Sequence, residues 1–181
     1  MSMRTAILAA AMAAMAATAQ AGTYTFTQGG FSGGGSISGS FAGADADGNG
    51  IIDFSANEVT AFFVGFSGDT AVGSFSLGLD DLAGLVYDLH GGSFIGDGGA
   101  IGSGEGIAAF TSQFAYLTGV GLVGLKPSAG NGGDVLAGDW QSPAASSGTM
   151  ALVAVSPVPE PENAALWLGG LAMLGLGRRR R

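Results

Sequence analysis

The sequence has 181 residues, of which 35 are glycine and none is cysteine, so disulfide bonds and thiolate metal sites are excluded. Between Gly22 and Val158 it holds twelve acidic residues and a single basic one, Lys126, which gives this stretch a net charge of −11. Binding to nucleic-acid phosphates needs Lys or Arg, so a nucleic-acid partner is excluded as well.

Residues 1–21 have the features of a secretory signal peptide, in the usual order. Arg4 supplies a positive charge, residues 5–17 form a short Ala-rich apolar stretch, and Ala19 and Ala21 fit the small-x-small cleavage pattern. An amphipathic helix is the alternative, but the stretch has no polar face. We therefore expect a signal peptide helix read by the Sec export machinery, and a mature chain that starts at Gly22.

Residues 22–156 are expected to form one Gly-rich, acidic, all-β domain. Apolar and polar residues alternate in short runs separated by glycine pairs, and no sustained helical period occurs free of glycine. The expected strands cover residues 23–27, 37–41, 58–66, 75–79, 85–89, 110–117, 120–125, 135–140 and 150–155. Phe62 and Phe63 place aromatic rings on both faces of their strand, so this strand is expected to be central.

Short strands with turns between them predict an antiparallel β-sandwich or a barrel-like domain. A loosely ordered Gly-rich segment is the alternative. The chain contains 11 Phe, and their alternation with polar residues argues against disorder, which normally lacks aromatic residues.

One expected loop is rich in oxygen donors. The donors are Asp45, Asp47, Asn49, the carbonyl group of Ile51, and Asp53. With Gly50 at the turn, their spacing resembles the first nine positions of an EF-hand calcium loop. The bidentate Glu of the twelfth position is missing, since Ala56 stands there and the nearest acid is Glu58.

Two interpretations of this loop stay open. It is either a calcium site between two strands that recruits Glu58 through a bulge, or a solvated turn, since Asp, Asn and Gly favour turns for conformational reasons. The preceding residues 33–43 are too rich in glycine for an EF-hand helix. Calcium is thus a candidate ligand, and no other cofactor is expected.

Little in the sequence points to catalysis, and we expect no enzyme. His90 is the only histidine, and it falls at the end of an expected strand. Asp80 and Asp81 are adjacent, so a strand would point them to opposite faces, and a turn is the better interpretation. Tyr116 and Trp140 are either sugar-stacking groups or core residues. A Ser-His-Asp arrangement stays open because its members meet only in the fold.

Residues 157–181 contain three segments in order. The first is Pro159, Glu160 and Pro161, the second is a 14-residue apolar stretch at 164–177, and the third is Arg178, Arg179, Arg180 and Arg181. The apolar stretch is shorter than the roughly 20 residues of a full helical span, and it crosses a membrane if the arginines snorkel and the bilayer thins. The positive-inside rule then keeps the arginines in the cytoplasm and places the acidic domain outside.

These three segments resemble the PEP-CTERM sorting signal. The resemblance implies a substrate of exosortase, a membrane-embedded cysteine-protease-like transpeptidase of Gram-negative bacteria that typically make exopolysaccharide. It also implies cleavage near Pro159-Glu160-Pro161, after a stage in which a single transmembrane helix tethers the chain to the inner membrane. Delivery to the cell surface or the extracellular matrix would follow. An ordinary single-pass anchor is the alternative interpretation of the tail.

The tail predicts where the protein goes and leaves open what its domain does. We expect a structural or adhesive role at the surface or in the matrix, with exopolysaccharide as a candidate partner. A secreted calcium- or polysaccharide-binding module is the alternative, and an exported hydrolase is the weaker one.

Overall fold

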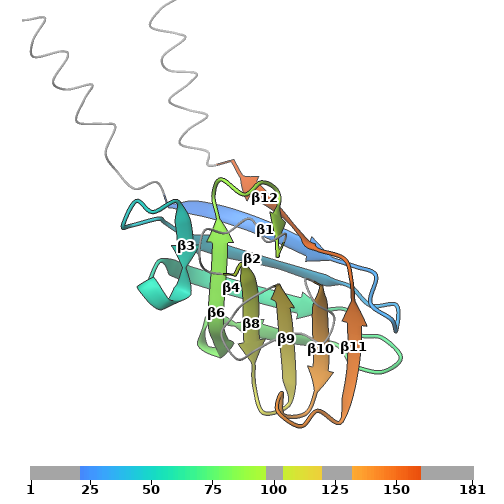
Figure 1. Cartoon of the computed structure of the whole chain (residues 1–181). Helices are drawn as coiled ribbons and strands as arrows, with labels where there is room; N and C mark the ends of the chain where they lie inside the picture. The colour runs from blue at the N-terminus through green and yellow to red at the C-terminus, as the bar shows by residue number, and fades with distance from the viewer. Residues whose placement is uncertain (1–20, 97–103, 120–131, 160–181) are drawn as a thin grey trace, which may run out of the picture.

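The fold is known from a computed structural model, which describes residues 21–96, 104–119 and 132–159 (Figure 1). Over these residues the chain forms twelve strands in two antiparallel sheets, together with two 3-10 turns. The expected all-β, antiparallel fold is confirmed, and the two sheets are consistent with the expected sandwich. Among the described residues, no helix is long and apolar enough to span a membrane. The expected signal peptide helix and the apolar stretch 164–177 lie outside the described residues.

Each sheet has six strands. Sheet A has the order β5-β4-β2-β1-β12-β7 and sheet B the order β11-β10-β9-β8-β6-β3. The strands of sheet A are β1 (Gly22–Gln28), β2 (Ile37–Gly43), β4 (Val59–Phe66), β5 (Phe75–Gly78), β7 (Phe94–Ile95) and β12 (Val153–Val158). Those of sheet B are β3 (Ile51–Asp53), β6 (Leu82–Asp88), β8 (Gly106–Phe110), β9 (Phe114–Gly119), β10 (Gly133–Ala137) and β11 (Ala145–Thr149). The strands of one sheet cross those of the other steeply (Figure 1).

An aromatic core fills the space between the sheets. Alternation along β1 and β2 points Phe26 and Phe41 inward, where each is 1% exposed. The Phe41 ring stacks on Tyr24, with centroids 4.9 Å apart, and meets Tyr87 of sheet B edge-on at 5.6 Å. Tyr116, which is fully buried on β9, completes the core from the other side. Aromatic side chains therefore join the two sheets.

The alternating sequence runs locate the first strands correctly. Residues 23–27, 37–41 and 58–66 lie in or next to β1, β2 and β4, as expected. Strand β4 has neighbours on both sides, β2 and β5, so its interior position is confirmed. Only one face of β4 is covered. Phe62 faces the core and is 6% exposed, whereas Phe63 points to the other side and is 51% exposed.

Two strand predictions are wrong. Residues 110–117 do not form one strand, because β8 ends at Phe110 and β9 begins at Phe114. The Thr111 hydroxyl accepts hydrogen bonds from the backbone N–H groups of Gln113 and Phe114, both at 3.2 Å, and so closes a hairpin turn that contains no glycine. The expected partner strand 120–125 lies outside the described residues. The strand expected at 150–155 is also misplaced, because Met150 falls between β11 and β12. Strand β12 ends at Val158, two residues past the expected end of the domain at 156.

The two ends of the described sandwich lie side by side. Strand β1 pairs antiparallel with β12, so that Thr23 is opposite Val158, and it pairs with β2, so that Gly22 is opposite Gly43. The chain therefore enters β1, leaves β12 and begins the acidic loop at the same end of sheet A (Figure 1).

Candidate metal site

The acidic loop connects the end of β2 in sheet A with β3 in sheet B. Strand β3 pairs with β6, and the Leu89 N–H donates to the Gly50 carbonyl group at 3.0 Å. Gly50 has a φ of 84°, a left-handed conformation that suits glycine, and a Cβ there would lie 2.7 Å from the His90 ring. The loop is therefore held against the end of β6.

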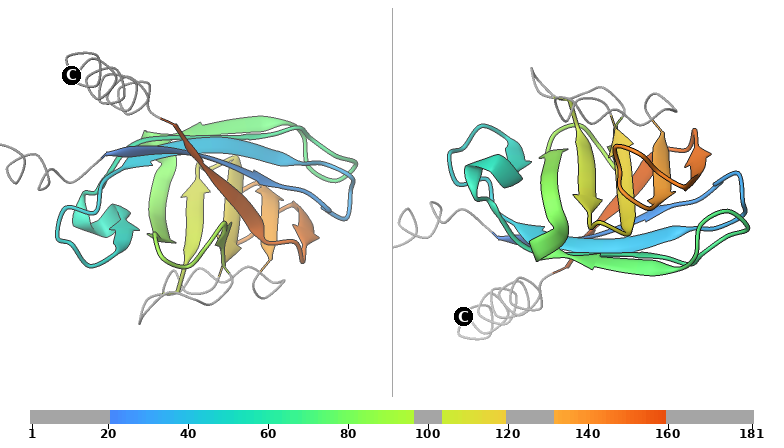
Figure 2. Two further views of the ribbon diagram at one scale, coloured as in Figure 1. Left: turned by 90° about the horizontal axis from the view of Figure 1, so that it is seen from above. Right: turned by 90° about the horizontal axis from the view of Figure 1, so that it is seen from below.

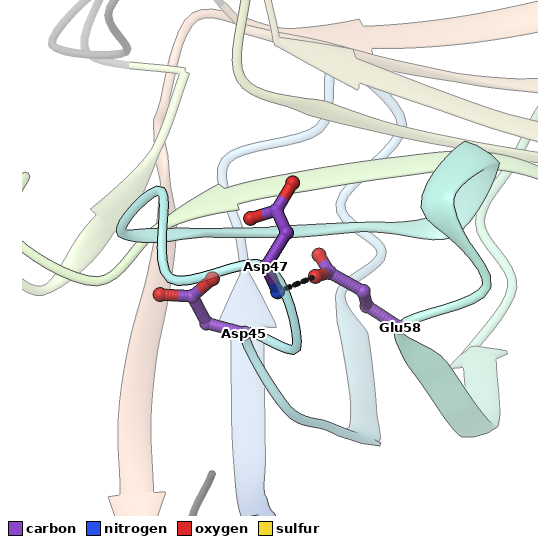
Figure 3. Close-up of side chains that lie close together, drawn as sticks. All are labelled: Asp45, Asp47 and Glu58. Atoms are coloured by element: carbon purple, nitrogen blue, oxygen red, sulfur yellow. Dashed lines mark hydrogen bonds between the residues drawn. The ribbon is translucent and has the colours of Figure 1, made fainter.

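The Glu58 carboxylate holds the loop together by accepting hydrogen bonds from its backbone N–H groups. Glu58 is 4% exposed, although it stands immediately before β4. One carboxylate oxygen accepts hydrogen bonds from the N–H groups of Ala46 at 2.8 Å and Asp47 at 3.4 Å, and the other accepts from Asp53 at 2.9 Å. Figure 3 shows the contact with Asp47. A buried carboxylate needs such donors, because it has been taken out of water.

Three carboxylates converge in this loop. One oxygen from each of Asp45, Asp47 and Glu58 lies within 4.8 Å of the other two (Figure 3). Calcium binds oxygen at about 2.3–2.6 Å, so two ligands of one ion stand at most about 5 Å apart. The three groups are thus spaced as partial ligands of one hard cation. The structure brings Glu58 to the two aspartates, as the calcium-site interpretation of the loop required and the solvated-turn interpretation did not.

The negative form of Asp45 is stabilised by the loop itself. Its carboxylate accepts hydrogen bonds from the N–H groups of Gly50 at 2.8 Å and Asn49 at 3.0 Å. These donors, Gly50 foremost, hold the pKa of Asp45 below its ordinary value. Each carboxylate oxygen can accept more than one interaction, so the same groups remain able to bind a cation.

The other expected ligands take local structural roles. The Asn49 side-chain oxygen accepts from the Ile51 N–H at 2.7 Å, and Ile51 pairs with Asp88 across β3 and β6. The Asp53 carboxylate accepts from the Ser55 N–H at 2.7 Å and so caps the 3-10 turn Phe54–Ala56. Asp53 is therefore not among the converging carboxylates.

No family model, curated protein or solved structure matches this chain.

The groups considered for catalysis are dispersed. The His90 side chain is 82% exposed at the end of β6, and its Nδ1 atom lies 3.8 Å from an Asp88 carboxylate oxygen. Asp80 and Asp81 lie in the 3-10 turn Leu79–Asp81, where the Asp81 carboxylate accepts from the Gly78 N–H at 2.8 Å. The turn interpretation of this pair is confirmed.

Neither aromatic group considered for sugar stacking is presented on an open face. Tyr116 is fully buried, its hydroxyl donates to the Gln28 side-chain oxygen at 2.9 Å, and burial raises its pKa. Trp140 is partly buried against Phe110, with ring centroids 5.5 Å apart. Both belong to apolar packing.

Residues of the two processing signals lie mostly beyond the described residues. Ala21 and Pro159 are described and exposed, just outside β1 and β12. Ala19, Glu160, Pro161 and Arg178–Arg181 lie outside the described residues.

Glu105 is a buried acid that the sequence pattern does not predict. Glu105 is fully buried, and its carboxylate accepts from the N–H groups of Asp88 at 3.0 Å and Gly96 at 3.3 Å. It thereby ties the end of β6 to the end of β7. The sequence around it, Gly-Ser-Gly-Glu-Gly, gives no periodic signal that would place it inside.

Proposed function

We propose that this chain is an exported bacterial surface or matrix protein with a structural or adhesive, non-enzymatic role. The tail carries the proposal: Pro159-Glu160-Pro161, an apolar stretch and four arginines follow one another in the order of a PEP-CTERM signal. In this proposal the Sec machinery exports the chain of a Gram-negative bacterium, the tail tethers it to the inner membrane, and an exosortase removes the tail.

The junction between domain and tail supports such processing. Strand β12 ends at Val158, and Pro159 follows it exposed, immediately outside the hydrogen-bonded register with β1. A protease needs an extended, accessible segment, and proline cannot continue the strand by donating a backbone hydrogen bond. Cleavage after Val158 would leave every described strand in place.

The motif is tested by replacing Pro159 and Glu160 together with alanine in the producing bacterium. We expect tail removal to be blocked, so that a full-mass precursor accumulates in the inner membrane, because the recognised sequence is gone. Mass spectrometry of the C-terminus and membrane fractionation measure this result. The matched control replaces Pro143 and Asp80, one exposed proline and one exposed acid away from the tail. Mature protein of normal mass and location in the Pro159/Glu160 variant would refute the sorting assignment.

Calcium binding is a second candidate function, favoured by the convergence of Asp45, Asp47 and Glu58. The site lies at the end of sheet A from which the tail leaves, because Gly43 and Val158 are both paired with the start of β1. A cation there would neutralise part of the acidic charge concentrated in the loop. Calcium would thus stabilise the loop that connects the two sheets.

Calcium at ten to one hundred times its dissociation constant is expected to stabilise the folded chain by about 1.4–2.7 kcal/mol. Extracellular calcium sites have dissociation constants of about 0.1–1 mM, so about 10 mM calcium is a suitable concentration. The measurement is the shift in melting temperature that calcium causes, compared with the shift that the same concentration of magnesium causes. Asp45→Asn should abolish the calcium shift. Asp80→Asn removes the same charge from an exposed turn and should keep it. Equal melting temperatures with and without calcium would leave the loop a solvated turn.

A further inference from the structure

Charge is distributed unequally between the two sheets. None of the six strands of sheet A contains an Asp, Glu, Lys, Arg or His residue. The strands of sheet B carry Asp53, Asp88 and Asp134, and the remaining described acids lie mainly in connections. In a stretch with a net charge of −11, the outer face of sheet A is thus a large neutral surface. Sheet B packs against the opposite face of sheet A (Figure 2).

Hydroxyl groups cover the middle of this outer face. They belong to Thr23, Thr25, Thr27, Ser38, Ser40 and Ser156, which alternate with the inward-pointing core residues of β1, β2 and β12. Ser156, Thr25 and Ser40 lie directly opposite one another across the three strands. Neighbouring strands are about 4.8 Å apart, so the hydroxyls form a regular, shallow array.

Two exposed aromatic rings flank the hydroxyl array. Phe63 on β4 lies opposite Ser40 and is 51% exposed. A Cβ at Gly65, the next outward position, would lie 3.6 Å from the Phe63 ring, so the ring leans along the sheet over that glycine. Phe94 on β7 is 45% exposed and lies opposite Ala154. The two rings stand four strand spacings apart, about 19 Å.

We propose that the outer face of sheet A binds a neutral polysaccharide. Sugar hydroxyls can exchange hydrogen bonds with the Ser and Thr hydroxyls, and the C–H faces of sugar rings can pack on Phe63 and Phe94. Binding buries no charge of the protein, so it avoids the desolvation penalty of an unpaired charge. The acidic remainder of the domain repels polyanions. The proposal gives a partner class to the adhesive role proposed above and in that sense rests on it.

A second copy of this chain fits the same face less well. The outer face of sheet A is five strand spacings wide and about 20 Å long, so a second copy would cover roughly 500 Å² of it. A standard interface covers roughly 800 Å² per partner. Two bodies of strong negative charge also repel each other. An extended polymer needs only a strip of the surface, and it carries no opposing charge.

The test is co-sedimentation of the full chain, purified in mild detergent, with microcrystalline cellulose, chitin and an insoluble α-glucan. We expect retention on at least one of these and none on cross-linked alginate, which is acidic. Phe63→Ala and Ser40→Asp should each weaken retention at least about tenfold. Ser146→Asp is the matched control, because it adds the same charge at an exposed position of β11 in sheet B. Thr25→Asp repeats the substitution beside Ser40, and a melting temperature for every variant shows that the fold persists.

Three outcomes would overturn the proposal. They are no retention on any of the three neutral polymers, retention unchanged in the folded Phe63 and Ser40 variants, and self-association that Ser40→Asp abolishes without any polymer binding. The last would make the face an interface between copies. These measurements use purified chain, so a failure of tail processing in the cell leaves them unaffected, and a failure here leaves the sorting assignment intact.

Discussion

Replacement of Phe41 by alanine is expected to lower the free energy of unfolding by about 3–5 kcal/mol. Phe41 is 1% exposed and contacts the rings of Tyr24 and Phe26 within sheet A and of Tyr87 in sheet B. Its removal leaves a cavity at the point where the sheets meet, and close-packed neighbours fill such a cavity only partly. Denaturant unfolding followed by tyrosine fluorescence measures the change.

The exposed ring at position 63 is the control for this prediction. Phe63→Ala removes the same atoms from the other side of sheet A, where the ring is 51% exposed, and should cost less than about 1 kcal/mol. If the two variants lost similar stability, the assignment of inner and outer faces to sheet A would be wrong.

A chain shortened to end at Leu152 is expected to lose its cooperative fold, whereas one that ends at Val158 keeps it. The shorter chain lacks β12, which pairs with β1 and β7 and buries Val153 and Val155 at 0% and 2% exposure. Burial of a valine side chain contributes about 1.5–3 kcal/mol, and each strand hydrogen bond adds about 0.5–1.5 kcal/mol. The sum is comparable with the whole stability of a typical domain, about 5–15 kcal/mol.

Thermal melts by circular dichroism and limited proteolysis distinguish the two shortened chains. The chain ending at Val158 serves as the control, because it lacks the same tail but keeps the strand. Cooperative melting of the Leu152 chain at the temperature of the control would mean that β12 is dispensable. The prediction also restricts tail processing, since a cut before Val153 would yield an unfolded product.

Strand positions could be predicted where side chains alternate strongly. In β1, Tyr24 and Phe26 alternate with threonines, and the structure exposes the threonines while Phe26 is buried and Tyr24 is half-buried. In β4, two adjacent phenylalanines predicted a central strand; β4 does have a neighbour on each side, but the second sheet covers only the face of Phe62. Periodicity identifies the strand and cannot say what covers its outer side.

The wrong and missing strands lack that signal. The turn between β8 and β9 is closed by the Thr111 hydroxyl and contains no glycine, so the sequence carries no glycine signal for it. Strand β11 reads Ala-Ser-Ser-Gly-Thr and buries Ser147 and Thr149, whose hydroxyls make hydrogen bonds where an apolar residue was expected. Strands β3 and β7 have three and two residues, too few to show a period.

The candidate metal site was predictable in part. Local spacing predicted Asp45, Asp47 and Asn49 as ligands of one cation, because alternate residues in a tight loop point their oxygens toward one centre. The contribution of Glu58 depends on the 3-10 turn and on Asn57, whose φ of 60° lets the chain turn back under the loop. The Asp53 carboxylate, which was also expected as a ligand, caps that same turn and is not among the three carboxylates that converge. Backbone conformation, which spacing alone does not encode, decides which carboxylates converge.

The antiparallel pairing of β1 with β12 also determines how the domain would respond to mechanical force. A pull on the C-terminal end of β12 acts on Val158 along the strand axis and loads the row of backbone hydrogen bonds from Thr23 to Thr27 in shear, all at once. A pull applied between Gly22 and Val158 would instead peel the same row apart one bond at a time. A domain that is held at its C-terminal end and bound to a surface through the outer face of sheet A is therefore loaded in shear, its more resistant direction.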